Sequence, residues 1–171
     1  MGAAATNSSA WVDRAPTRVA TGTSKSGGNG PAGGRHPNGR FWHRANFDGY
    51  GEQLDGQPWN SFPPDTRATR GRAWPIFSGE RGEYDLLAGQ PATAQLAAMA
   101  GAANEGGMIP EQVWDDQPPS GTPGFPKGEG TLSATPLAWS HAQFVRLAWS
   151  IEAGRPVEQP SVVACRYVRS C

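Results

Sequence analysis

The sequence predicts an all-α fold for the part of the chain that follows residue 36, with a disordered segment ahead of it. Three segments carry helix start and stop signals. The only strand-like pattern is the short Ser-Val-Val-Ala run at residues 161–164. The 23 Gly and 16 Pro among 171 residues are spread unevenly, which argues that not all of the chain folds.

Residues 1–36 are rich in Ala, Gly, Ser, Thr, Asn and Arg, and most of the segment lacks large apolar side chains. Such a segment cannot bury enough apolar surface to offset the entropy lost on ordering. We therefore expect residues 1–36 to be disordered and residues 37–171 to form the folded domain. The N-terminus does not resemble a secretory signal, and no run of about 18 apolar residues suggests a membrane span. Localisation stays open.

Residues 40–64 alternate aromatic side chains with Gly, Asp and Pro. No sustained period is visible, so the pattern predicts a structured loop rather than a helix or a strand. Loops that carry aromatic residues and carboxylates are frequent binding sites.

Two helices are predicted next. Ser78 is a good N-cap for a helix that runs to about Ala88, where Gly89 would end it. A second helix is predicted over residues 91–104, with Pro91 in its first turn. Its apolar face would hold Ala92, Leu96, Met99 and Ala103.

The strongest helical pattern follows, with Thr135 as its cap, Pro136 in its first turn and Gly154 as its stop. Trp139 and Trp149 fall outside the main apolar face. A helix with two apolar faces is usually buried between layers. His141 lies on the apolar face, where we expect a hydrogen-bonded core residue rather than a metal ligand.

Glu111 stands in the run Met-Ile-Pro-Glu-Gln-Val-Trp-Asp at residues 108–115. A carboxylate beside an amide and an indole, fixed by a preceding proline, is suited to activating water as a general base. Taken alone, an exposed and merely solvated Glu is the commoner explanation of such a run.

Three further strings accompany this run: residues 48–52 (Asp-Gly-Tyr-Gly-Glu), 74–82 (Trp-Pro-Ile-Phe-Ser-Gly-Glu-Arg-Gly) and 133–140 (Ser-Ala-Thr-Pro-Leu-Ala-Trp-Ser). In this order the four strings resemble the C-terminal part of a bacterial glycoside hydrolase of family 15, the glucoamylase and glucodextranase group. The resemblance covers residues 37–167. It implies the C-terminal portion of an (α/α)6 barrel and a polysaccharide-degrading hydrolase that cleaves α-glucosidic bonds at chain ends with anomeric inversion.

By this resemblance Glu111 is the catalytic base. Gln112 is a polar neighbour that binds substrate or helps to hold the site, and Tyr50 lines the sugar pocket. Trp74 matches a tryptophan beside the scissile sugar, although core packing explains a buried Trp equally well.

Arg44 and Asp48 match an Arg and an Asp that bind the terminal glucose in this family. A guanidinium donates in a fork and a carboxylate accepts from hydroxyls, so the pair suits a diol edge. The alternative is a local ion pair that braces the loop. Ala45 departs from the family, in which an aromatic residue usually follows the Arg.

An inverting glycosidase also needs a carboxylic acid that protonates the leaving oxygen. In the family this acid comes from an earlier part of the barrel that has no counterpart here. We therefore expect the isolated chain to be inactive as a glucan 1,4-alpha-glucosidase. The alternative is a non-catalytic, truncated remnant that at most binds sugar weakly.

The partners implied are an α-glucan or gluco-oligosaccharide substrate and, if the barrel is rebuilt, a separate chain that carries the missing helices. The formal net charge is zero, which argues against nucleic-acid or membrane partners. The implied chemistry needs no metal or organic cofactor.

Overall fold

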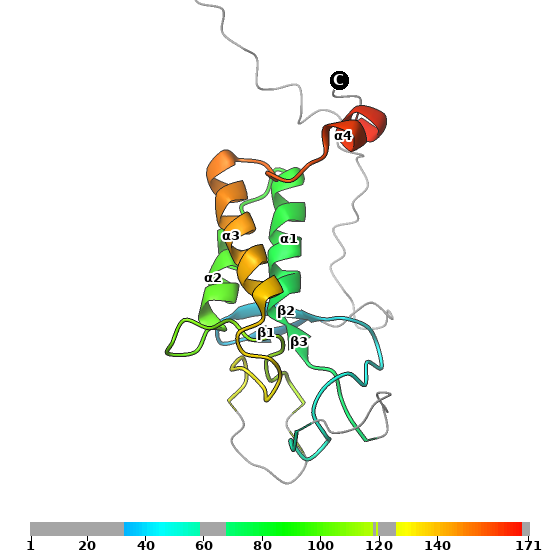
Figure 1. Cartoon of the computed structure of the whole chain (residues 1–171), viewed down its shortest axis with the longest axis vertical. Coiled ribbons are helices and arrows are strands. Elements are labelled where there is room, and N and C mark those ends of the chain that lie inside the picture. Colours follow the sequence, from blue (N-terminus) through cyan, green and yellow to red (C-terminus); the bar gives the residue numbers. More distant parts are fainter. Residues whose placement is uncertain (1–32, 59–67, 118, 120–125, 169–171) are drawn as a thin grey trace, which may run out of the picture.

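The computed structural model describes residues 33–58, 68–117, 119 and 126–168 (Figure 1). Three helices stand side by side above a small sheet: α1 (Pro75–Leu87), α2 (Thr93–Gly101) and α3 (Ala138–Ala153). A fourth helix, α4 (Ser161–Val168), lies at the opposite end from the sheet. In the described part of the chain, none of the helices is both long and apolar enough to cross a bilayer.

The sheet is the main departure from the all-α prediction. It consists of β1 (Gly33–His36), β2 (Gly39–His43) and β3 (Ala73–Trp74), which are antiparallel and lie in sequence order. The expectation of a loop from residue 40 and of disorder up to residue 36 is therefore wrong for these two strands. The predictions for residues 1–32 lie outside the described residues.

A tight hairpin explains why β1 and β2 form from an irregular sequence. His36 pairs with Gly39, so Pro37 and Asn38 alone make the turn. Gly39 has a φ of 132°, and a Cβ there would lie 2.5 Å from the Ala98 Cβ. The Asn38 side chain donates to the Gly101 carbonyl at 2.6 Å, which ties the hairpin to the end of α2.

Helix α1 begins four residues earlier than predicted. Pro75 occupies its first turn and Trp74 is its N-cap, in extended conformation. Ser78 is not a cap but a buried residue inside the helix, where its hydroxyl donates to the Arg40 carbonyl at 2.8 Å. The predicted stop is confirmed, since α1 ends at Leu87 and Gly89 follows with a φ of 69°.

Helices α2 and α3 both begin later than predicted, and α2 also ends at Gly101 rather than at residue 104. Ala92 is the N-cap of α2, which leaves Pro91 outside the helix. Leu137, in extended conformation, is the N-cap of α3, and the Thr135 hydroxyl donates to the Ser133 carbonyl instead of capping the helix. The stop of α3 is confirmed, because Gly154 follows Ala153 with a φ of 67°.

Residues 161–164 form the start of α4 and not a strand. The Val163 and Ala164 amides both donate to the Pro160 carbonyl at 3.0 Å, which closes the first helical turn. Val162 and Tyr167 are largely exposed. The β-branched pair at residues 162 and 163 was therefore a misleading signal for a strand.

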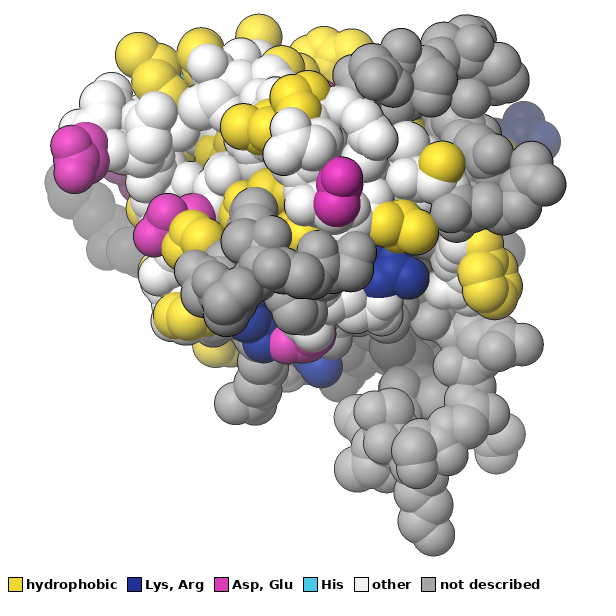
Figure 2. Space-filling model, turned by 90° about the horizontal axis from the view of Figure 1, so that it is seen from below, with side chains coloured by type: hydrophobic (Ala, Val, Ile, Leu, Met, Phe, Trp, Pro, Cys, Tyr) yellow, Lys and Arg dark blue, Asp and Glu magenta, His cyan; other side chains and the backbone are white. Residues whose placement is uncertain are grey.

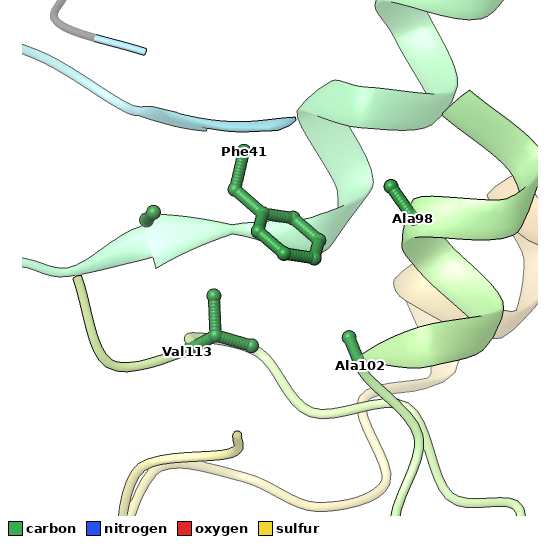
Figure 3. Close-up of a cluster of buried hydrophobic side chains, with 5 residues drawn as sticks. Phe41, Ala98, Ala102 and Val113 are labelled. Atoms are coloured by element: carbon green, nitrogen blue, oxygen red, sulfur yellow. The ribbon is translucent and has the colours of Figure 1, made fainter. Parts of the chain in front are cut away.

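Two apolar clusters form the core. Between the sheet and α2, the Phe41 ring points toward Ala98, Ala102 and Val113, with Ala73 beside them (Figure 3). Between the helices, Ala92, Met99 and Leu147 are buried together. Helix α3 thus has one buried face, while Trp139 and Trp149 are exposed. The expectation that both apolar faces of this helix are buried is wrong within this chain.

Close helix packing predicts that Gly79→Ala destabilises the fold. A Cβ at Gly79 would lie 2.3 Å from the Gln143 Cγ and 2.9 Å from the Met99 Sδ. We expect the free energy of unfolding to fall by about 1–3 kcal/mol in urea denaturation, despite the better helix propensity of Ala. Glu80→Ala, at an exposed position of the same helix, should stay within about 0.5 kcal/mol of the parent. Equal stability of the two variants would contradict the packing.

Candidate active site

Most of the predicted site residues belong to loop segments that lie below the sheet in Figure 1, whereas Trp74 is the last residue of β3. The segment that carries Glu111 runs beside β3, because the Val113 amide donates to the Ala73 carbonyl at 2.8 Å. The loop of residues 44–56 is joined to the same segment at Tyr50. Seen from this end, apolar, basic and acidic side chains lie close together on the surface (Figure 2).

Arg44 and Asp48 form a forked ion pair. The Arg44 Nε donates to Asp48 Oδ2 at 3.0 Å and Nη2 donates to Oδ1 at 2.8 Å. Asp48 Oδ1 also accepts from the Tyr50 amide at 2.9 Å. The Asp48 side chain is 6% exposed and that of Arg44 is 44% exposed. The pair therefore braces the loop, and its solvent-facing group is the guanidinium.

Aromatic rings surround the Arg44 guanidinium. Its carbon lies 4.8 Å from the Tyr50 ring centroid and 5.6 Å from that of Trp74. The two rings are themselves 6.1 Å apart. Trp74 is buried, which fits a packing role, and its indole nitrogen has no hydrogen-bond partner among the described residues. The guanidinium lies over both tilted rings, a cation–π arrangement that holds it in place with part of its surface exposed.

Glu111 is half-buried next to this group. Its amide donates to the Ala134 carbonyl at 2.9 Å, and its carboxylate is hydrogen-bonded to the Tyr50 side chain. Burial raises the pKa of the Glu111 carboxyl above its ordinary value, and the negative charge of Glu52 raises it further. A hydrogen bond from the Ala134 backbone to the carboxylate, the positive charge of Arg44 and the hydrogen bond with the Tyr50 side chain act in the opposite direction and lower this pKa. A carboxylate with a raised pKa is a stronger base.

Gln112 lies behind Glu111 and is 1% exposed. Its side-chain oxygen accepts from the Arg72 amide at 2.5 Å, and its side-chain nitrogen donates to the Tyr50 carbonyl at 3.0 Å. Its main-chain amide donates to the Ser133 hydroxyl at 3.1 Å. Gln112 thus joins three segments, which fits the role of holding the site rather than a direct sugar contact.

Helix α3 fixes the approach to Glu111. The His141 Nε2 accepts from the Ile109 amide at 2.9 Å, so the expected hydrogen bond is present, although His141 is only partly buried and also lines a groove on α3. The Ser140 hydroxyl donates to the Pro110 carbonyl at 3.1 Å, and the Leu137 amide donates to the Ile109 carbonyl at 3.0 Å. The N-terminal turn of α3 therefore sets the position of the residues just before Glu111.

Sequence reasoning missed a buried ion pair behind the site. The Arg72 Nη1 donates to Asp115 Oδ1 at 3.0 Å and to the Gln117 carbonyl, and its guanidinium carbon lies 5.0 Å from the Trp114 ring centroid. His43 Nε2 lies 3.4 Å from Asp115 Oδ2. Arg72 and His43 are far from Asp115 in the chain, and no sequence spacing predicts that their side chains meet.

Glu52 also belongs to the surroundings of Glu111. It follows Tyr50 in the same loop and is 2% exposed. Its Oε2 atom is buried and has no hydrogen-bond partner among the described residues. A buried carboxylate close enough to raise the pKa of Glu111 is part of the electrostatics of the site, although its burial keeps it from a ligand.

Comparison with known proteins supplies the family. No family model matches the sequence. Over 132 residues the chain is 42% identical to a glucoamylase from Clostridium sp. (strain G0005); the match covers 77% of this chain and 16% of that protein.

The structure matches a crystal structure of a bacterial glucoamylase in complex with acarbose, with a TM-score of 0.68 and 40% identity over 80% of this chain and 18% of the other. The helices therefore belong to part of an α/α barrel, as predicted, and the small sheet is an addition to that prediction. This chain is a homologue of the bacterial glucoamylases, with which it shares sequence and fold over the segment that it spans.

Proposed function

We propose that this chain supplies the general-base side of a glucoamylase-type site, which releases glucose from the non-reducing end of an α-glucan or oligosaccharide with inversion. The observation that carries the proposal is the position of Glu111, a half-buried carboxylate with a raised pKa beside Arg44. The homology to a glucoamylase and the acarbose bound by the structural relative support a sugar-like ligand.

In this mechanism Glu111 accepts a proton from a water molecule as the water oxygen attacks the anomeric carbon. The glycosidic bond to the leaving oxygen breaks, and a carboxylic acid donates the proton which that oxygen needs. Because Glu52 is nearly fully buried, we assign the acid to a different segment of the complete site. No metal or organic cofactor takes part in these steps.

The sugar would be held chiefly by Arg44. Its guanidinium, oriented by Asp48, is the exposed group of the pair and can donate to two neighbouring hydroxyls. Trp74 would support the site by packing against the Tyr50 ring and the Arg44 guanidinium. Through its side-chain hydrogen bond to the Tyr50 carbonyl, Gln112 holds the loop that carries Tyr50 against the segment that carries Glu111.

The protein partner we propose is the rest of the barrel, on the same chain or on a separate one. A groove of about 450 Å³ runs along the exposed face of α3, between Val145, Arg146 and Trp149 on the helix and Glu158 beyond it. Trp139 extends the apolar surface. Exposed apolar patches of this kind are typical of protein contacts.

The test is glucose release from maltotriose and isomaltotriose by the purified full chain and by Glu111→Gln. We expect any turnover to fall about 10²–10⁴-fold in the variant, because the amide cannot accept the proton. Glu105→Gln, which changes an exposed carboxylate nearby, is the matched control and should leave turnover unchanged. Turnover that persists in Glu111→Gln would contradict the assignment.

Binding separates this proposal from its alternative when the chain alone shows no turnover. The full chain should bind acarbose in calorimetry, and Arg44→Met should weaken that binding at least about tenfold, as expected for a charge-assisted contact. A folded chain that neither binds acarbose nor releases glucose would favour the non-catalytic remnant.

A further inference from the structure

The Tyr50 hydroxyl and the Glu111 carboxylate form a side-chain hydrogen bond. Both groups have raised pKa values, in each case chiefly because of burial. The phenol therefore keeps its proton at neutral pH and is the donor of this bond. An ionised Glu111 carboxylate is the acceptor.

Tyr50 is fixed at both ends of its backbone by other residues of the site. Its amide donates to Asp48 Oδ1 at 2.9 Å, and its carbonyl accepts from the Gln112 side chain at 3.0 Å. The ring is held on its face by the Arg44 guanidinium, whose carbon lies 4.8 Å from the ring centroid. With the backbone and the ring both fixed, the hydroxyl has a defined position.

We propose that Tyr50 is a positioning residue that holds the Glu111 carboxylate through its hydroxyl, and not a residue that reads the sugar. The proposal rests on the general-base role proposed for Glu111. The phenol and the Ala134 backbone both hydrogen-bond the carboxylate, so that the base is held in one orientation toward the water whose proton it accepts. A base held in one orientation loses less entropy on reaching the reactive geometry.

The charges around Glu111 set the direction of the expected effect. Burial and the charge of Glu52 disfavour the ionised carboxylate, whereas the Ala134 backbone hydrogen bond, the Arg44 charge and the Tyr50 hydroxyl favour it. Asp48 acts on Tyr50 and raises the pKa of the phenol. Removal of the hydroxyl alone therefore takes away one interaction that lowers the pKa of Glu111, and this pKa should rise.

The first experiment is Tyr50→Phe, with the titration of Glu111 followed by NMR in the full chain carrying ¹³C-labelled Glu. The ring and its contacts with Arg44 and Trp74 remain in this variant. We expect the midpoint of Glu111 to move to higher pH. Tyr84→Phe, on the exposed side of α1, is the matched control and should leave the midpoint unchanged. An unchanged or lowered midpoint in Tyr50→Phe would overturn the proposal.

A kinetic readout separates positioning from sugar contact. Wherever turnover of maltotriose is measured, Tyr50→Phe should lower kcat and leave KM unchanged, because the hydroxyl acts on the base. A raised KM with an unchanged kcat would overturn the proposal and make Tyr50 a sugar-binding residue. The titration needs no turnover, so a shifted midpoint in a chain that neither releases glucose nor binds acarbose would uphold the contact while the proposed function fails.

Discussion

Arg72→Met should lower the free energy of unfolding by about 3–5 kcal/mol, one of the largest losses expected for a single substitution in this chain. The Arg72 and Asp115 side chains are 1% and 5% exposed. Removing the cation leaves a buried carboxylate without its main partner, and a buried charge without a partner is costly. The variant also loses the donor to the Gln117 carbonyl and the contact with the Trp114 ring.

The measurement is urea denaturation of the full chain, with a surface ion pair as the control. Lys127 pairs with Asp116, and both side chains are partly exposed, so Lys127→Met should cost at most about 1 kcal/mol. The double variant Arg72→Met/Asp115→Leu should recover much of the loss, since no charge is then stranded. Equal losses in the free energy of unfolding for Arg72→Met and Lys127→Met would mean that the buried ion pair stabilises the fold no more than the surface pair does.

Arg72 matters to the site as well as to stability. Its amide donates to the Gln112 side chain, which in turn holds the Tyr50 carbonyl. Arg72 also sits directly before β3, whose last residue is Trp74. A loosened Arg72 would therefore disturb the support of Glu111 from two directions.

The ends of α1 and α3, unlike that of α2, were well predicted because their cause is local. Gly89 and Gly154 adopt positive φ values at the ends of α1 and α3, and only the residue itself is needed to favour such a stop. The helix starts were displaced because the expected caps have better partners elsewhere. Ser78 donates to Arg40, on the neighbouring strand, and this partner cannot be read from the residues around Ser78.

The contacts of the candidate site likewise fall into local ones, which the sequence predicts, and long-range ones, which it does not. Arg44 and Asp48 stand four residues apart, so their contact was foreseeable from spacing. Tyr50 and Gln112 are 62 residues apart, and Arg72 and Asp115 are 43 apart. Such contacts depend on the tertiary fold, and short motifs report only which residues have the right chemistry. The strands escaped prediction for the same reason, because a two-residue pairing such as that of β3 has no periodic signal.

Leu147→Ala should destabilise the chain by about 2.7–5 kcal/mol. Leu147 is 0% exposed and lies in the cluster with Ala92 and Met99 that joins α3 to α2. The substitution removes apolar contact and leaves a cavity that rigid helices can close only in part. Val145→Ala, two residues earlier on the same helix, is the matched control. Since Val145 is 63% exposed, its loss should stay within about 0.5 kcal/mol.

A second variant tests whether the loss at Leu147 arises from packing against α1. A Cβ at Gly82 would lie 2.8 Å from both methyl carbons of Leu147, so Gly82→Ala alone should be destabilising. Once Leu147 is Ala, those carbons are gone and the added methyl group enters the cavity. The double variant should therefore be more stable than the sum of the two single losses requires. Strict additivity in urea denaturation would show that α1 and α3 do not meet at these two residues, and the position of the Glu111 segment under α3 would then need another support.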